Sequence, residues 1–208
     1  MKSFTLATIF MLLASQAWSD SFDDQLLVVQ HRWAQIQYQL PADQREDAFE
    51  ALAEQTAGLV ESNPERAEAL IWQGIVLSTY AGAKGGLGAL SLVKQARSSL
   101  ETALALDETA LEGSAHTSLG SLYYQVPGWP LSFGNDDEAK RHLQAALRIN
   151  PEGIDPNYFF GEFLMQQGET ERARVYLNKA LTAPPRPERP LADQGRRAEI
   201  RGLLAEMH

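Results

Sequence analysis

Two stretches of the chain, 139–151 (AKRHLQAALRINP) and 173–185 (ARVYLNKALTAPP), repeat one pattern. Each has alanine at its first position, leucine at its fifth, alanine at its eighth and proline at its last, and the copies lie 34 residues apart. Ala96, Leu100 and Ala103 form the same triplet earlier in the chain. Because apolar residues spaced by three and four share one side of a helix, the pattern predicts helices that pack through this small-residue face.

The segment before each triplet carries a glycine, at Gly74, Gly120 and Gly161, in a stretch that also has helical periodicity. A glycine facing an alanine lets two helix backbones approach closely, so helices are expected to pair as hairpins. A period of 34 residues is that of the tetratricopeptide repeat. The predicted fold class is therefore all-α: a tetratricopeptide-like array of helical hairpins with three to four degenerate repeats and a C-terminal capping helix.

The expected helices begin and end at turn and capping signals. Asn135 precedes Glu138 by three residues, which indicates an N-cap, and Asp155 before Pro156 predicts another. The first helical pair lacks the glycine and is either a degenerate repeat or an N-terminal cap. The predicted helices span 22–39, 43–62, 64–80, 89–106, 109–125, 136–149, 156–167, 169–182 and 191–206.

Composition excludes several function classes. The 208 residues hold 18 basic and 27 acidic side chains, a balance that argues against nucleic acid as a partner. The chain has no cysteine, and its four histidines show no metal-ligand spacing. No nucleophile elbow or comparable catalytic motif is found. We expect no catalytic residue, no metal and no cofactor, and therefore a protein that is not an enzyme.

The N-terminus resembles a targeting segment. Lys2 precedes an apolar run at 4–14, which is too short to cross a bilayer, and Ala17 and Ser19 fit a cleavage site. Residues 1–19 are predicted to be a cleavable signal peptide, with 20–208 as the helical-repeat domain; the alternative is an uncleaved anchor or a buried first helix. Without a cysteine the exported protein is not lipidated, and we expect it in the periplasm.

Two insertions, within 80–90 and 123–134, fall at hairpin tips, where repeat proteins place binding loops. The first has a glycine-rich run around Lys84 but no phosphate-loop pattern, so a flexible turn is expected, or a turn that holds a carboxylate. Aromatic residues are frequent in the second insertion and in the predicted helix at 156–167. They are expected either to pack in the core or to line a ligand cavity or a groove for a partner. The candidate ligand- or partner-binding residues are Tyr80, Lys84, Tyr123, Tyr124, Trp129, Phe133 and Tyr158.

Four segments, 80–90, 123–137 (YYQVPGWPLSFGNDD), 153–159 and 184–197, resemble the tetratricopeptide T-component proteins associated with tripartite ATP-independent periplasmic (TRAP) transporters. The resemblance covers the chain from about residue 64 to its end. It implies a helical-repeat protein that encloses an apolar channel or cavity, self-associates, and binds the periplasmic substrate-binding subunit of a transporter. Some relatives are lipoproteins, which this chain without a lipobox cysteine is not.

Together these observations predict a periplasmic, non-enzymatic binding or scaffold protein. Its expected partners are a periplasmic solute-binding protein or another envelope protein, an apolar or carboxylate small molecule, and a second copy of the chain. An apolar hollow toward the looped rim is expected to hold the ligand. The alternative is a structural tetratricopeptide adaptor for cell-envelope assembly that has no small-molecule ligand.

Overall fold

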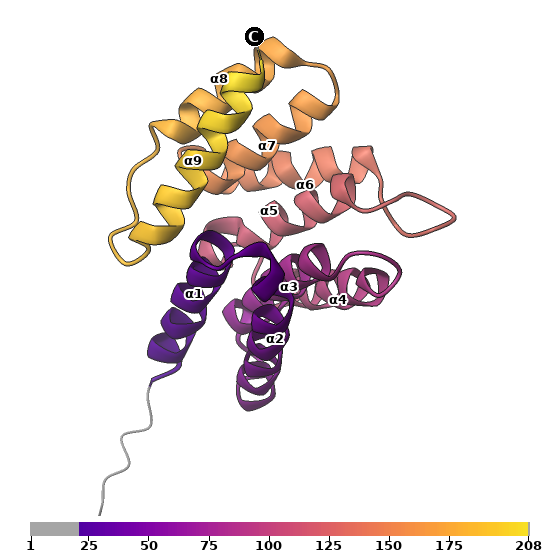
Figure 1. Ribbon diagram of the computed structural model, residues 1–208, viewed down its shortest axis with the longest axis vertical. Helices are drawn as coiled ribbons and strands as arrows, with labels where there is room; N and C mark the ends of the chain where they lie inside the picture. Colours follow the sequence, from indigo (N-terminus) through magenta and orange to yellow (C-terminus); the bar gives the residue numbers. More distant parts are fainter. Residues whose placement is uncertain (1–20, 208) are drawn as a thin grey trace, which may run out of the picture.

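The computed structural model describes residues 21–207, and within this range every named element is helical. The predicted signal peptide, residues 1–19, lies outside the described residues. Figure 1 shows the helices stacked from the N-terminal pair to the C-terminal helix. They are α1 (Phe22–Gln39), the short 3-10 helix η1 (Ala42–Gln44), α2 (Arg45–Ser62), α3 (Ala67–Lys84), α4 (Ala89–Leu106), α5 (Ala110–Gln125), α6 (Asp136–Ile149), α7 (Ile154–Gln166), α8 (Thr170–Leu181) and α9 (Pro190–Glu206).

Most predicted boundaries agree with these helices to within two residues, and α3 is the largest exception. It begins at Ala67, after a turn at Pro64 and Glu65, and continues to Lys84 instead of ending near residue 80. Gly85 ends it with a φ of 64°, a conformation that favours glycine. Residues 80–84 of the first predicted insertion therefore belong to a lengthened α3, and only 85–88 form the connection to α4.

The two predicted caps have different outcomes. The Asn135 side chain accepts hydrogen bonds from the backbone N–H groups of Asp137 and Glu138, at 2.9 and 3.0 Å, so this N-cap is confirmed. The prediction for Asp155 is wrong, because α7 begins one residue before it with Gly153 as the N-cap. The Asp155 carboxylate is instead paired with the side chains of Arg186 and Arg196.

Close packing in three hairpins confirms the expected role of the glycines, although the side chain that faces each glycine is a leucine and not the expected alanine. A Cβ atom added to Gly74, Gly120 or Gly161 would lie 2.5, 2.5 and 2.8 Å from the Cγ atom of the facing leucine. These leucines are Leu100, Leu143 and Leu177, which are fully buried. The repeated leucine therefore fills the space that the missing glycine side chain leaves, in α3–α4, α5–α6 and α7–α8 alike.

The hairpins stack so that their first helices form one continuous row. Contacts link α1 to α3, α3 to α5, α5 to α7 and α7 to α9, while α2, α4, α6 and α8 each pack against the helix that follows. Within the described residues, four hairpins and one final helix make up this array, as the repeat pattern predicted. The row of first helices forms the inner face of the stack.

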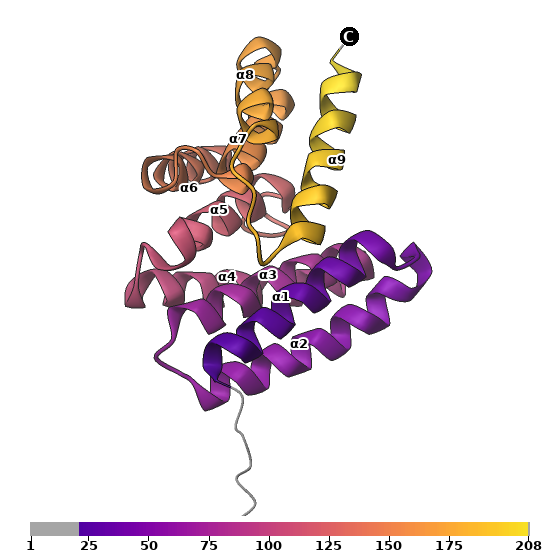
Figure 2. The same cartoon turned by 90° about the vertical axis from the view of Figure 1, so that its left-hand side faces the viewer.

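Helix α9 does more than cover the last hairpin. It packs against α7 and α8 and also reaches back to α1 at the opposite end of the array (Figure 2). A Cβ on Gly195 would lie 2.4 Å from ring atoms of Tyr38, so the two helices approach closely. A ring nitrogen of His31 also lies 2.6 Å from the backbone oxygen of Glu188, just before α9. The array is thus closed across its inner face.

The first turn of α5 departs from regular helix geometry. Leu111, Glu112 and Gly113 have φ values of 47°, 56° and 77°, which place all three in the left-handed region. This region is unfavourable for leucine and glutamate. The turn brings Leu111 and Glu112 to the inner face of the array.

Candidate binding groove on the inner face

A groove of about 1200 Å³ lies on the inner face, between the first helices of the hairpins and α9. Side chains from α1, α3, α5, α7 and α9 line it, together with the proline-rich segment 184–189 that precedes α9. This volume is somewhat above the roughly 300–1000 Å³ of typical small-ligand pockets, so the groove is large enough for a small organic ligand. The return of α9 toward α1 closes one side of this groove (Figure 2).

Hydroxyl groups from α5 form one wall of the groove, spaced by three and four residues along one side of the helix. Ser114 and Thr117 direct their hydroxyls to backbone oxygens of their own helix, at 2.6 and 3.5 Å. The half-buried Ser118 and Ser121 have no hydrogen-bond partner within residues 21–207. These two hydroxyls are available to a ligand.

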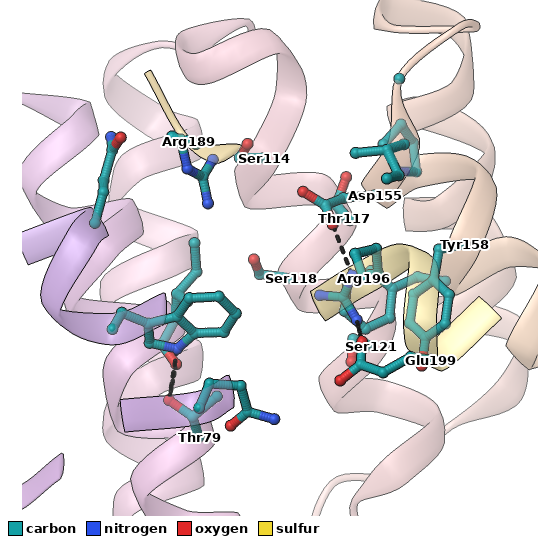
Figure 3. Close-up of a pocket in the computed structure, with 18 of the residues that line it drawn as sticks. Thr79, Ser114, Thr117, Ser118, Ser121, Asp155, Tyr158, Arg189, Arg196 and Glu199 are labelled. Carbon is teal, nitrogen blue, oxygen red and sulfur yellow. Dashed lines mark hydrogen bonds and ion pairs between the residues drawn. The ribbon is translucent and has the colours of Figure 1, made fainter. Parts of the chain in front are cut away.

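Aromatic side chains flank this hydroxyl wall on both sides. Trp33 of α1 packs edge to face against Trp72 of α3, with ring centroids 6.1 Å apart, and donates its indole N–H to the Thr79 hydroxyl at 3.1 Å. On the other side, Tyr158 and Phe159 of α7 pack edge to face at 5.0 Å. Thr79 and Tyr158 lie on opposite sides of the opening in Figure 3.

A partly buried ion network attaches α9 and the proline-rich segment to α7. Asp155 accepts from the guanidinium groups of Arg186 at 2.6 Å and Arg196 at 2.9 Å. Burial by itself raises the pKa of Asp155, but the nearby arginines outweigh burial and hold it well below its usual range. Arg186 also donates to the buried Asp193 at 2.6 Å. Both carboxylates are therefore fully engaged by arginines of their own chain.

Arg196 contributes to the groove both as an ion-pair partner and as a cover for aromatic rings. Its guanidinium lies 4.2 Å from the ring centre of Tyr158 and 4.7 Å from that of Phe159, and it donates to Glu199 at 2.7 Å. Tyr38 donates its hydroxyl to the same Glu199 at 3.3 Å. Burial raises the pKa of the Tyr38 and Tyr158 hydroxyls above the ordinary value, so both rings stay neutral.

Arg189 differs from Arg186 and Arg196, the other arginines beside it in the groove, because it has no carboxylate partner within residues 21–207. Its Nε atom is buried without a hydrogen bond, and its guanidinium lies 5.0 Å from the ring centre of Trp72. Burial and the positive charge of Arg186 lower the pKa of Arg189 to about 10, so the side chain remains protonated near neutral pH. One positive charge is therefore left unbalanced at the edge of the groove.

The structure separates the seven candidate residues into four places. Tyr158 lies in the groove wall. Tyr80 and Lys84 face α2 instead: Tyr80 donates to Glu50 at 2.7 Å, and Lys84 forms an ion pair with Glu46 at 2.9 Å. The hydrogen bond to Glu46 and that to Tyr80 raise the pKa of Lys84 above its ordinary value.

Three of the other candidates are packed against the protein itself. Tyr123 is buried in contact with Phe133, with their ring centroids 5.5 Å apart, and both rings lie under the Arg97 guanidinium. Tyr124 contacts Phe163 and donates a short hydrogen bond to Glu162. Burial, followed by the charge of Glu162, raises the pKa of Tyr124 well above its ordinary value.

Trp129 lies alone on the α5–α6 loop, with 90% of its surface exposed, and Leu131 beside it is 64% exposed. The large groove does not include this loop. A smaller hollow of about 440 Å³ lies between the loop and α4, lined by Arg97 and Phe133 among others. The expected hollow at the looped rim is therefore the minor one, because loop rings pack against α4 while the helices leave space on the inner face.

Sequence reasoning missed the arginines and serines of the groove. The segment 184–190 indicates only a turn before the last helix, although it carries Arg186 and Arg189. A signal was present in α5, where Ser114, Ser118 and Ser121 interrupt an apolar helix on one side. That regular row of hydroxyls on a buried helix indicates a polar cavity rather than solvent.

A second polar cluster lies inside the α5–α6 hairpin. Arg141 contacts the Nε2 atom of His142 at 2.9 Å, the two Nδ1 atoms of His142 and His116 lie 2.8 Å apart, and Nε2 of His116 lies 3.0 Å from Glu108. Because arginine can only donate, we infer a chain of donors that runs from Arg141 to Glu108 through neutral His142. Burial, followed by the charge of Arg141, lowers the pKa of His142 to about 4.

Metal clusters and membrane-spanning helices are both missing from the described part of the chain. No cluster of three or more histidine, aspartate or glutamate side chains in residues 21–207 is placed to hold a metal ion. Within the same residues, no helix is both long and apolar enough to span a membrane.

Comparison with known proteins agrees with this architecture. Residues 131–207 match the family model described as tetratricopeptide repeat. A thermophilic tetratricopeptide-repeat protein of Thermus thermophilus has a similar crystal structure, with a TM-score of 0.57 and 22% sequence identity over 86% of this chain and 82% of that one. No curated protein gives a significant match. The described chain thus has a tetratricopeptide-like fold, and its C-terminal part matches the tetratricopeptide repeat family model itself.

Proposed function

We propose that the protein is a non-enzymatic scaffold of the periplasm, accessory to a TRAP-type transporter, that binds a solute-binding protein together with an apolar or carboxylate ligand. Tetratricopeptide arrays are interaction scaffolds, which supports the general role. The resemblance of segments 80–90, 123–137, 153–159 and 184–197 supports the link to TRAP transporters. The observation that carries a ligand-binding role is the groove of about 1200 Å³ on the inner face.

The groove favours ligand binding because its walls combine apolar area with unsatisfied polar groups. Aromatic rings from α1, α3 and α7 supply area for hydrophobic contact, and the hydroxyls of α5 supply directional hydrogen bonds. Ion pairs and tight packing hold the helices that carry these groups in place. A site of this kind binds without changing shape, which reduces the entropic cost of association.

Export is tested first, with the full chain expressed in a bacterial host that has a periplasm. We expect the protein in the periplasmic fraction, and N-terminal sequencing of the purified protein is expected to begin at Asp20. Recovery in the cytoplasm with Lys2 still present would contradict the periplasmic role.

The transporter role is tested with purified solute-binding subunits of TRAP transporters from the same organism. Isothermal titration calorimetry is expected to detect one subunit that binds the processed protein at micromolar concentration. An ABC-type solute-binding protein serves as the control and is expected not to bind. Failure of every TRAP subunit would remove the transporter role and leave the ligand groove to be judged separately.

One observation favours the second candidate, a structural adaptor in envelope assembly without a small-molecule ligand. Trp129 and Leu131 project from the α5–α6 loop, away from the groove, and expose apolar area typical of a protein contact. Light scattering over a range of concentrations tests whether the loop joins two copies of the chain. A dimer that Trp129→Ala dissociates would support self-association through this loop, whereas a monomer at all concentrations would exclude it.

A further inference from the structure

We propose that Arg189 anchors the carboxylate of a small organic acid in the groove, and that the body of this acid lies along Ser118 and Ser121 of α5. This inference rests on the proposed ligand-binding role of the groove and specifies the chemistry of the ligand. It also assigns a function to the proline-rich segment 184–189, which holds Arg189 at the groove edge.

The first argument comes from the charges around Arg189. The carboxylates nearest to it are already engaged, since Asp155 accepts from Arg186 and Arg196, and Asp193 accepts from Arg186. Among the other groove carboxylates, Glu162 accepts from Tyr158 and Glu199 accepts from Arg196. Glu188, which precedes Arg189 in the chain, is exposed and forms no ion pair with it within the described residues. Within the described residues Arg189 has no carboxylate at ion-pair distance, whereas Arg186 and Arg196 each have two.

The second argument concerns the sign of the ligand charge. Aromatic walls can also bind cations, which lie over the ring faces. In this groove, however, guanidinium groups already cover the faces of Trp72, Tyr158 and Phe159. A cationic ligand would meet positive charge at those faces, whereas an anionic one would meet donors. The groove therefore favours an anion over a cation.

The third argument concerns the shape of the anion. A guanidinium binds a carboxylate through two parallel hydrogen bonds, and the two terminal nitrogens of Arg189, which have no hydrogen-bond partner within residues 21–207, can provide them. Figure 3 shows Arg189 on the same side of the opening as Ser114, with Ser118 and Ser121 further along α5. A ligand that starts at Arg189 can thus extend along the helix and pass two unpartnered hydroxyls. An organic acid with a further hydroxyl or carbonyl group and an apolar part fits this sequence of contacts.

The probes for this proposal are 3-phenyllactate, 2-hydroxyoctanoate and 4-hydroxybenzoate, each compared with its uncharged amide. Binding to the processed protein is measured by calorimetry and by the fluorescence of Trp33 and Trp72. We expect at least one acid to bind, and its amide to bind about tenfold or more weakly, because a charged hydrogen bond is lost. If none of the three acids binds the wild-type protein, the proposal is wrong.

The variant Arg189→Gln is expected to weaken binding of the acid by about 10- to 100-fold and to leave binding of the amide unchanged. Arg201→Gln, which removes an equal charge from an exposed position on α9, is the matched control and is expected to bind as the wild type does. Circular dichroism and the melting temperature check that both variants fold. Equal binding of the acid by wild type and Arg189→Gln would overturn the proposal.

A second variant, Ser118→Leu, keeps the test valid if Arg189→Gln is poorly folded. The larger side chain is expected to obstruct the groove and to weaken binding of acid and amide together. Undiminished binding of the acid by Ser118→Leu would place it outside the groove and overturn the proposal. If instead the amide binds as well as the acid, Arg189 is not the anchor, but the groove still binds a ligand and the broader function stands.

Discussion

The interiors of the hairpins and the groove on the inner face follow opposite rules of construction. The hairpin interiors are mainly apolar and are built from neighbouring segments of the chain, and in three of them a glycine packs against a leucine at nearly the same distance. The groove combines aromatic rings with polar and charged groups, and it collects side chains from α1, α3, α5, α7 and α9, which are far apart in the sequence. Its ion pairs, such as Asp155 with Arg186, do not follow the repeat.

This contrast separates the residues that specify the array from those that specify the site. The repeated residues position helices and can be recognised by their period. The groove depends on residues that have no counterpart in the repeat pattern, such as Asp155 and Arg189, and on the return of α9 to α1. Substitutions in the two regions should therefore differ in what they disturb: packing in one, attachment of α9 in the other.

The largest effect is expected from Asp155→Asn. Removing this carboxylate leaves Arg186 and Arg196 partly buried without their common partner, which should lower the free energy of unfolding by about 3–5 kcal/mol. Urea denaturation measures the loss, and hydrogen exchange should show faster opening of α9. Asp23→Asn breaks an ion pair in which the aspartate side chain is 84% exposed and should change little. Equal losses in both variants would contradict the structural role of the network.

Gly120→Ala tests the hairpin side of the comparison. The new Cβ would lie 2.5 Å from Leu143 Cγ, so the helices must separate, and we expect a loss of about 2–3 kcal/mol. Gly58→Ala, within α2, meets no atom within 4 Å and should stabilise the protein by about 0.5–1 kcal/mol. Thermal and urea unfolding distinguish the two, since opposite signs are predicted. A neutral Gly120→Ala would show that the close approach is not required.

Acidification should weaken the α5–α6 hairpin through His142. Its pKa is about 4 in the folded protein against 6.5 ordinarily, so between these values the unfolded chain binds a proton that the folded chain does not. The contribution of His142 to the free energy of unfolding is fully present above pH 6.5 and falls as the pH decreases toward 4. Between pH 7 and 5 we expect the free energy of unfolding to fall by about 1–2 kcal/mol, with solvent screening taken into account. Urea midpoints across this range should fall less steeply for His142→Gln. An unchanged slope would contradict the assignment.

The smallest effect on stability is expected from Trp129→Ala. The side chain is 90% exposed, so the free energy of unfolding should change by less than about 0.5 kcal/mol. Binding of a protein partner or of a second copy, measured by calorimetry and light scattering, is expected to weaken. A large loss of stability would instead mean that this ring packs against its own chain.

Much of the fold could be predicted because the array is encoded locally. The α-helices of residues 21–207 and their order follow from periodicity and turn signals, and the partners of Gly74, Gly120 and Gly161 follow from the repeat. A predicted helix boundary was wrong where one residue could have either of two roles. Asp155 has the sequence context of an N-cap, but it forms ion pairs with residues more than thirty positions away. Local patterns cannot reveal such a partner.

The candidate site could be predicted less well for the same reason. Aromatic crowding on α7 points to Tyr158, and the structure places this residue in the groove wall. Arg189 escaped notice because a proline-rich segment has no periodicity that would show which way a side chain points. Tyr80 and Tyr123 are predicted as binding residues because they lie near insertions. In the structure Tyr80 donates a hydrogen bond to Glu50 of α2, and the Tyr123 ring stacks on His142 of α6. A position near an insertion in the sequence therefore does not place these two residues in the wall of the large groove.

The return of α9 to α1 also affects how the chain reaches its native state. Helical-repeat proteins ordinarily fold by local contacts that propagate from one repeat to the next. Here His31 contacts Glu188 across 157 positions, and Tyr38 contacts Glu199 across 161. Closing so long a loop costs entropy that only a nearly complete array can offset. We therefore expect the hairpins to form early, and the groove to be completed in the last and slowest kinetic step.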